Sequence, residues 1–188
     1  MAFLSEQELR SVGFRELGRH VLISDRAAIH GAMDIILGSH VRVDDFCILS
    51  AGSAGIRIGS FVHIAAYSSI IGAGAVVIED FANISSRVSV YSSSDDYSGA
   101  TMTNPMVPDE LKSVHRAPVN IGRHVIIGSG SVVLPGVTIA EGAAVGALSL
   151  IREDCEPFRI YAGVPAKARR DRRRDLLDVE RRLRNDEF

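Results

Sequence analysis

Cysteine is scarce in this chain of 188 residues, which contains only Cys47 and Cys155. The two lie far apart and neither belongs to a CxxC pair, so we expect neither a disulfide framework nor a zinc site. We expect both thiols to behave as small buried hydrophobic side chains. The sequence offers no cluster of metal-ligating residues, and we therefore predict no metal site.

Charge of one sign and long hydrophobic runs are also missing. The 21 Lys and Arg residues nearly balance the 23 Asp and Glu residues, and the net charge of −2 speaks against nucleic acid as a partner. No apolar run is long enough to cross a membrane, and the start MAFLSEQELR lacks the basic and apolar regions of a signal peptide. We therefore expect a single cytoplasmic domain that is not inserted into a membrane.

The sequence is instead rich in a repeat of six residues. In the C-terminal half the repeat places an aliphatic residue at Ile121, Ile127, Val133, Ile139, Val145 and Ile151. The residues between them that we expect at inward corners are small or β-branched: Val125, Ser131, Val137, Ala143 and Ser149. Shorter runs with the same period begin at Ile23, Leu37, Ile58 and Ile78. The segments LGSHVRV, IGSFVHI and IGRHVII are copies of one unit.

This period fits neither an amphipathic helix, which repeats about every 3.6 residues, nor plain alternation along a strand. Three hexapeptides make one triangular coil, and stacked coils bury a ladder of Ile, Val and Leu side chains. The predicted fold class is all-β: a parallel β-helix of hexapeptide repeats with an extended loop and short terminal helices.

The open ends of the stack need covers, and the sequence predicts a helix for each end. Ser5 and Glu8 have the spacing of a capping box at the start of the N-terminal helix. Residues 166–184 are expected to form the C-terminal helix, with Leu176, Val179 and Leu183 on one face that packs on the coils or on a neighbouring subunit. The predicted division is a β-helix domain over residues 1–165 and a C-terminal helix over residues 166–188.

The repeat stops between Val90 and Ile121, where residues 91–120 form a polar insertion. Long loops on a regular scaffold usually carry function. This one concentrates titratable side chains as no other part of the repeat does: Asp95, Asp96, Tyr97, His115 and Arg116. We predict that the chemistry takes place here, in a pocket completed by the wall of a neighbouring subunit.

The segment from Val119 to Arg170 resembles the hexapeptide-repeat acyltransferases, in particular the branch with the maltose, galactoside and xenobiotic acetyltransferases. VNIGRHVIIGSGSVVLPGVTIAEGAAVGALSLI is similar to the closing coils of that family, and YAGVPAKARR is similar to its G-x-P-A-K ending. The resemblance implies a left-handed β-helix, a homotrimer, and acetyl-CoA bound as acyl donor in the groove between adjacent subunits.

Four residues match cofactor-binding positions of the family. Ser129 and Ala147 lie where its members offer backbone N–H groups to the pantetheine arm and the thioester, and small side chains there keep the groove open. Lys167 and Arg170 match basic positions that approach the phosphates of coenzyme A. The resemblance thus implies a donor site that runs along the closing coils.

Asp95 departs from the family pattern. Members that acetylate hydroxyl groups have a catalytic histidine at the start of the loop, where this sequence has SSSDDY, with Asp95 in the place of the histidine. A hydroxyl needs a base of matched pKa, usually imidazole, whereas an amine needs less help. The loss of the histidine therefore favours an amino sugar as acceptor, with Asp95 and Asp96 holding its ammonium group and relaying a proton.

The loop pattern SRVSVYSSSDDYSG followed by TNP is similar to that of acyltransferases acting on dTDP-4-amino-4,6-dideoxyglucose. The leading hypothesis is acetyl-CoA-dependent N-acetylation of such a nucleotide-linked sugar for surface polysaccharide synthesis. One alternative is an O-acetyltransferase of a galactoside or polysaccharide sugar that uses His115, or His63 at a repeat corner, as base. The other alternative is a non-catalytic or carbonic-anhydrase-like β-helix protein.

Overall fold

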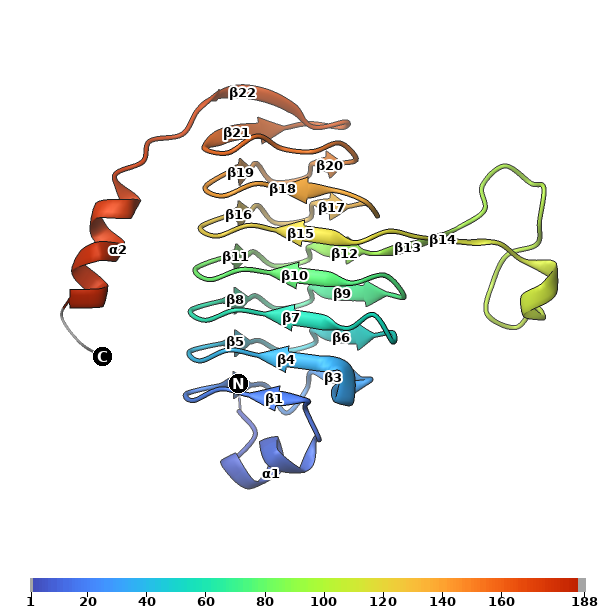
Figure 1. The fold of residues 1–188 in the computed structure, drawn as a ribbon, viewed down its shortest axis with the longest axis horizontal. Coiled ribbons are helices and arrows are strands. Elements are labelled where there is room, and N and C mark those ends of the chain that lie inside the picture. The colour runs from blue at the N-terminus through green and yellow to red at the C-terminus, as the bar shows by residue number, and fades with distance from the viewer. Residues whose placement is uncertain (1, 186–188) are drawn as a thin grey trace.

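The computed structural model describes residues 2–185 and shows a triangular prism whose three faces are parallel sheets (Figure 1). Successive strands of the coils belong to different sheets, so each complete coil passes through all three faces; only β13 (Ser93–Asp95) and β14 (Val114–Arg116), and β21 (Arg159–Ala162) and β22 (Lys167–Asp171), follow one another within one sheet. This architecture confirms the predicted all-β parallel β-helix.

The chain enters the three faces in a fixed order, and they are called the first, second and third face accordingly. The first face consists of β1 (Glu16–Leu17), β4 (Ile35–Leu37), β7 (Ile56–Ile58), β10 (Val76–Ile78), β15 (Val119–Ile121) and β18 (Thr138–Ile139). The second face consists of β2 (Leu22–Ile23), β5 (Arg42–Val43), β8 (His63–Ile64), β11 (Asn83–Ile84), β16 (Ile126–Ile127), β19 (Ala144–Val145), β21 (Arg159–Ala162) and β22 (Lys167–Asp171). The third face consists of β3 (Ala28–His30), β6 (Ile48–Ala51), β9 (Ser69–Gly72), β12 (Ser89–Tyr91), β17 (Val132–Val133) and β20 (Leu150–Ile151). A short 3₁₀ turn, η1 (Ala32–Asp34), precedes β4.

Aliphatic side chains at the repeat positions point into the prism and stack on their counterparts in the next coil. On the first face Ile58, Ile78 and Ile121 are paired in register, and none of them has exposed surface. All six aliphatic repeat positions from Ile121 to Ile151 are buried, and so are the small or β-branched residues at the inward corners between them. Burial of this apolar surface, at about 25 cal/mol per Å², is the main force that holds the coils together.

The corner between the first and second faces carries a stack of rings. The ring residues adopt left-handed backbone angles, with φ between 55° and 61°: His20, His40, Phe61, Phe81 and His124. Their ring centroids lie 4.7–5.0 Å apart from one coil to the next. A left-handed conformation costs about 1–2 kcal/mol, and ring stacking contributes about 0.5–1.5 kcal/mol per pair, so the stack offsets much of the cost of these tight corners.

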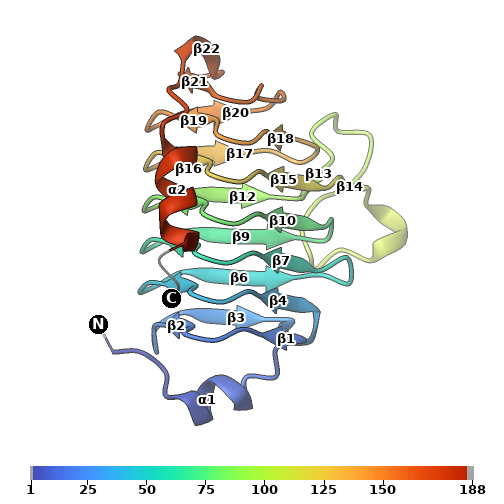
Figure 2. The same cartoon turned by 60° about the vertical axis from the view of Figure 1, so that its left-hand side comes forward.

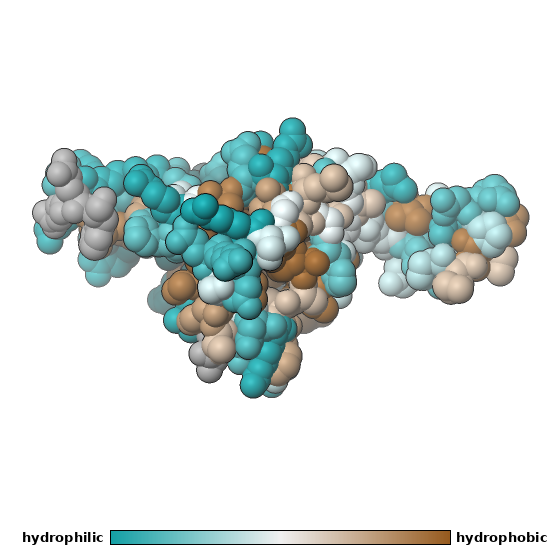
Figure 3. Space-filling model, turned by 90° about the horizontal axis from the view of Figure 1, so that it is seen from below, coloured by the Kyte–Doolittle hydropathy of each residue, from teal (hydrophilic) through white to brown (hydrophobic). Residues whose placement is uncertain are grey.

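The insertion forms a two-stranded arm. Strands β13 (Ser93–Asp95) and β14 (Val114–Arg116) pair antiparallel, and a 3₁₀ turn, η2 (Asp109–Leu111), lies near the tip. The arm leaves the prism after β12 and returns at β15, at the corner between the third and first faces. Viewed from the N-terminal end, the arm and the C-terminal helix project to opposite sides of the prism (Figures 1 and 3).

The N-terminal cover confirms the predicted capping box. Helix α1 (Glu6–Ser11) begins after Ser5, whose hydroxyl accepts a hydrogen bond from the Glu8 amide. The Glu8 carboxylate in turn accepts a 2.8 Å hydrogen bond from the Ser5 amide. The reciprocal bonds satisfy two backbone donors that a helix start leaves unpaired.

The C-terminal helix is shorter than predicted. Residues 167–171 form strand β22, which pairs antiparallel with β21, and helix α2 (Leu176–Asn185) begins only afterwards. Residues 186–188 of the predicted helix lie outside the described residues. The prediction is wrong for 167–171 because β21 presents an open sheet edge, and pairing with that edge satisfies its backbone groups.

Helix α2 lies beside the prism and is held there through Glu180 (Figure 2). Glu180 is buried and pairs with Arg123 and with His124 on the coils. Val179, on the apolar face that we expected to pack inward, is 63% exposed. A buried carboxylate thus docks the helix, because the ring corner it meets carries cationic and imidazole side chains.

Candidate acyl-transfer site

Ser129 and Ala147 lie on the corner between the second and third faces, one coil apart. Both residues are exposed. Neither of their amide N–H groups donates to an acceptor in the described part of the chain. A Cβ atom on Gly128 would lie 2.4 Å from the Ala147 amide nitrogen, so only glycine permits this approach of the two coils. The corner therefore presents free backbone donors at two positions with small side chains, beside the exposed side chain of Leu148.

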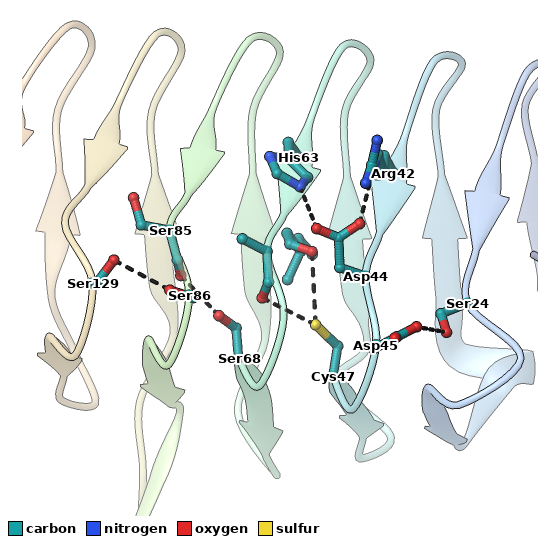
Figure 4. A network of polar contacts seen from close by, with 12 residues as sticks. Ser24, Arg42, Asp44, Asp45, Cys47, His63, Ser68, Ser85, Ser86 and Ser129 are labelled. Atoms are coloured by element: carbon teal, nitrogen blue, oxygen red, sulfur yellow. Dashed lines mark hydrogen bonds and ion pairs between the residues drawn. The ribbon is translucent and has the colours of Figure 1, made fainter. Parts of the chain in front are cut away.

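Ser86 extends the same corner toward the N-terminus. Its hydroxyl lies 3.3 Å from the Ser129 hydroxyl, and Figure 4 shows these side chains in line with Ser68 along the corner. Sequence reasoning missed Ser86, although the repeat contains the signal. Ile84 pairs with Ile127, so the second residue after each occupies the same place in successive coils.

Lys167 and Arg170 lie on β22, at the C-terminal end of the second face. Both side chains are exposed, and the Lys167 ammonium lies 3.3 Å from the Glu153 carboxylate. Exposed ion pairs of this kind are worth about 0–1 kcal/mol, so both cations remain available to an anionic ligand.

Asp95 and His115 occupy opposite strands of the arm. Asp95 pairs with Val114 and His115 with Ser94 in the two-stranded ladder, and both titratable side chains are exposed. The arm leaves the prism at a different corner from the one that holds Ser129. One subunit therefore does not bring Asp95 and His115 to the free amide groups.

The Asp96 side chain forms hydrogen bonds that hold the arm in shape. Its carboxylate accepts hydrogen bonds from the amides of Ser98 at 2.8 Å and Thr101 at 3.0 Å, and from the Thr101 hydroxyl at 2.9 Å. The bonds from Ser98 and Thr101 lower the pKa of Asp96 to about 2. A carboxylate with so low a pKa is a poor general base near neutral pH, so this geometry fits a scaffolding group better than a proton acceptor.

His63 lies within strand β8 rather than at a corner, where its coil has Phe61. Its Nε2 atom lies 2.9 Å from Oδ2 of Asp44, and Oδ1 of Asp44 accepts a 2.7 Å hydrogen bond from Nε of Arg42 (Figure 4). Burial raises the pKa of Asp44, but the hydrogen bonds from Arg42 and His63 outweigh it and leave this pKa below its ordinary value. The sequence did not single out Asp44, because its contact with His63 crosses from one coil to the next.

Within residues 2–185, no group of three or more His, Cys, Asp or Glu side chains has the arrangement of a metal site. Cys47 and Cys155 are both buried free thiols. Burial raises the pKa of the Cys155 thiol to about 12, so this sulfur stays protonated and unreactive near neutral pH. No helix in the described part of the chain is long and apolar enough to cross a membrane.

Comparison with known proteins places these features in a family. Residues 118–153 match the family described as bacterial transferase hexapeptide (six repeats). The chain is 54% identical over 180 residues to the dTDP-4-amino-4,6-dideoxy-D-glucose acyltransferase of Escherichia coli, covering 96% of this chain and 94% of the relative.

Solved structures of AntD, an N-acyltransferase from Bacillus cereus, share the fold over the whole length. Its complex with dTDP and 3-hydroxybutyryl-CoA is 42% identical, with a TM-score of 0.93 over 98% of this chain and 97% of that one. A serine-to-alanine mutant in complex with dTDP-4-amino-4,6-dideoxyglucose and coenzyme A is 40% identical, with a TM-score of 0.93 over 98% of each chain. The chain therefore belongs to the hexapeptide-repeat acyltransferases and shares their left-handed β-helix.

Proposed function

We propose that this protein transfers an acyl group from acyl-CoA to the amine of a nucleotide-linked amino sugar of the dTDP-4-amino-4,6-dideoxyglucose type. The observation that carries the proposal is the similarity over 96% of the chain to an acyltransferase named for that sugar. The complexes of AntD with this sugar or dTDP and with coenzyme A derivatives support the same pair of substrates. We take acetyl as the simplest acyl group.

The donor lies along the corner that carries Ser129 and Ala147. The free amide N–H groups of these residues hold the pantetheine arm and the thioester carbonyl, whose oxygen gains negative charge during attack. One preorganised donor to such an oxyanion is worth about 2.7–4 kcal/mol of transition-state stabilisation. Lys167 and Arg170, at the C-terminal end of the same stack, bind the phosphates of the donor.

The acceptor amine is held by the arm. Asp95 attracts the ammonium form and takes one of its protons, leaving a neutral amine as nucleophile. The amine nitrogen forms a bond to the thioester carbonyl carbon and the C–S bond breaks. The second proton lost by nitrogen protonates the thiolate of coenzyme A, so the products are the amide and free coenzyme A. Asp96 supports this step by shaping the loop beside Asp95.

The active enzyme is a cytoplasmic homotrimer in this proposal. Asp95 and the Ser129 corner lie on different edges of one prism, so the reacting groups meet only when a second copy supplies one of them. Binding both substrates in one inter-subunit groove also removes much of the entropic barrier to their encounter.

The test is release of free coenzyme A thiol from acetyl-CoA by the purified full chain, with dTDP-4-amino-4,6-dideoxyglucose and simple galactosides compared as acceptors. We expect turnover on the amino sugar and a product acylated on nitrogen. Turnover on galactosides alone would contradict the proposal and favour an O-acetyltransferase.

A further inference from the structure

A second feature faces outward one coil away from Ser86: the pair formed by His63 and Asp44. The Asp44 side chain is only 9% exposed, and its two oxygens are bound separately by Arg42 and His63. Because hydrogen bonds from these partners keep the Asp44 pKa low, the carboxylate is ionised and can only accept. The Nε2 atom of His63 must therefore carry the hydrogen, and in the neutral ring Nδ1 is left as a hydrogen-bond acceptor.

The place of His63 along the prism puts it on the acceptor side of the donor groove. On the second face the strands follow one another in the order β8, β11, β16, β19, β21 and β22. Lys167 lies on β22 and Ser129 lies two residues after β16, so the phosphate end and the acyl end of the donor are separated by three strand spacings, about 14 Å. His63 on β8 lies two spacings, about 10 Å, beyond the acyl end.

The outward-facing residues of the second face change from apolar to polar beyond the acyl end of the donor. The register of the second face aligns the outward residues Leu22, Arg42, His63, Asn83, Ile126 and Ala144. The residues beside the proposed pantetheine path, Ile126 and Ala144, are apolar. Those on the far side of the acyl end, His63 and Asn83, carry hydrogen-bonding groups. The apolar residues suit the pantetheine arm of the donor, and the polar residues beyond them suit a sugar that carries hydroxyl groups.

We propose that His63 is a positioning residue of the acceptor site, and this inference rests on the function proposed above. Its Nδ1 atom accepts a hydrogen bond from a hydroxyl group of the amino sugar, and Asp44 holds the ring in the tautomer and orientation that make this possible. His63 thereby turns the sugar so that its amine faces the thioester, and it takes no part in the covalent step.

The test compares two amides at position 63 in the intact protein, with steady-state kinetics for both substrates. His63→Gln places an amide nitrogen near the position of Nε2, so it keeps a donor to Asp44 but loses the outward acceptor. His63→Asn places an amide oxygen near the position of Nδ1, so it keeps the acceptor but loses the bond to Asp44. His40→Gln, in the ring stack at another corner, is the matched control.

We expect His63→Gln to raise the KM for the amino sugar about tenfold, while the KM for acyl-CoA stays within about twofold of the parent value. His63→Asn should retain more of the acceptor affinity than His63→Gln does. The reverse order, with Gln close to the parent and Asn impaired, would assign His63 a structural role and overturn the inference. An acceptor KM unchanged in both variants would overturn it as well.

The same assay separates this inference from the proposed function. If the parent enzyme does not acylate the amino sugar, the proposed function fails whatever the variants do. If the parent is active and both variants match it, only the role of His63 fails. Thermal midpoints of the variants, compared with that of His40→Gln, identify any loss of folded protein.

Discussion

Glu180 of helix α2 accepts a 2.7 Å hydrogen bond from Nε2 of His124, and the two side chains are only 7% and 10% exposed. Burial, together with the neighbouring Arg123, Arg172 and Arg184, lowers the pKa of His124. The imidazole is therefore neutral near neutral pH and serves Glu180 as a hydrogen-bond donor. Glu180 also pairs with Arg123 on the coils and with Arg184 on its own helix, so one carboxylate joins the helix to two side chains of the prism.

We expect Glu180→Ala to release helix α2 from the prism while the coils stay folded. Removing one member of a buried charged cluster costs about 3–5 kcal/mol, because the remaining charges lose their partner. Hydrogen–deuterium exchange should show fast exchange over residues 176–185 and unchanged protection of the β-strands. Asp178→Ala, which removes an exposed carboxylate from the same helix, should leave exchange unchanged. Equal protection in both variants would show that other contacts hold α2.

The low pKa of Asp96 predicts how far the pH can fall before the arm loses its ordered structure. Its pKa in the folded chain is about 2, below the ordinary value of 3.8, so its contribution to stability is complete above about pH 4 and is lost as the pH falls toward 2. We expect the Thr101 amide resonance to titrate with a midpoint near 2. A midpoint close to 3.8 would mean that the bonds to Ser98 and Thr101 do not persist in solution.

Asp95→Asn should lower kcat for the amino sugar about a hundredfold and leave the KM for acyl-CoA unchanged. The amide is isosteric with the carboxylate but neither attracts an ammonium group by charge nor takes its proton, and general-base groups typically contribute factors of about 10² to 10⁴. Asp109→Asn is the control on the same arm, since Asp109 is exposed and pairs with Lys112. Undiminished turnover in Asp95→Asn would remove this residue from the mechanism.

The double substitution of Lys167 and Arg170 by alanine should raise the KM for acyl-CoA about tenfold, with little change in kcat. Each exposed cation contributes about 0.5–1 kcal/mol to phosphate binding, and the contribution is screened by salt. The parent KM should therefore rise with ionic strength more steeply than that of the variant. Arg10→Ala, at the opposite end of the prism, is the control; identical salt dependence in parent and double variant would contradict a phosphate site on β22.

The sequence alone determined the repetitive part of the molecule. The six-residue spacing from Ile121 to Ile151 was sufficient to predict the parallel β-helix, because each position meets its own counterpart in the next coil and the pattern has only one way to be buried. The capping box of Ser5 and Glu8 was also predictable, since both partners lie within one helical turn.

The tertiary structure alone determined the contacts that depend on how separate coils align. Residues 167–171 look helical by composition, but the open edge of β21 makes them a strand. His63 has Asp44 as partner only because β5 and β8 stack in register, and nothing in the local spacing of the two residues reveals the pair. Local sequence patterns thus specify those elements that are stabilised by residues close in the chain or by exact repetition. Sheet edges and hydrogen bonds between coils form only after the chain has wound into its prism, so no local pattern specifies them.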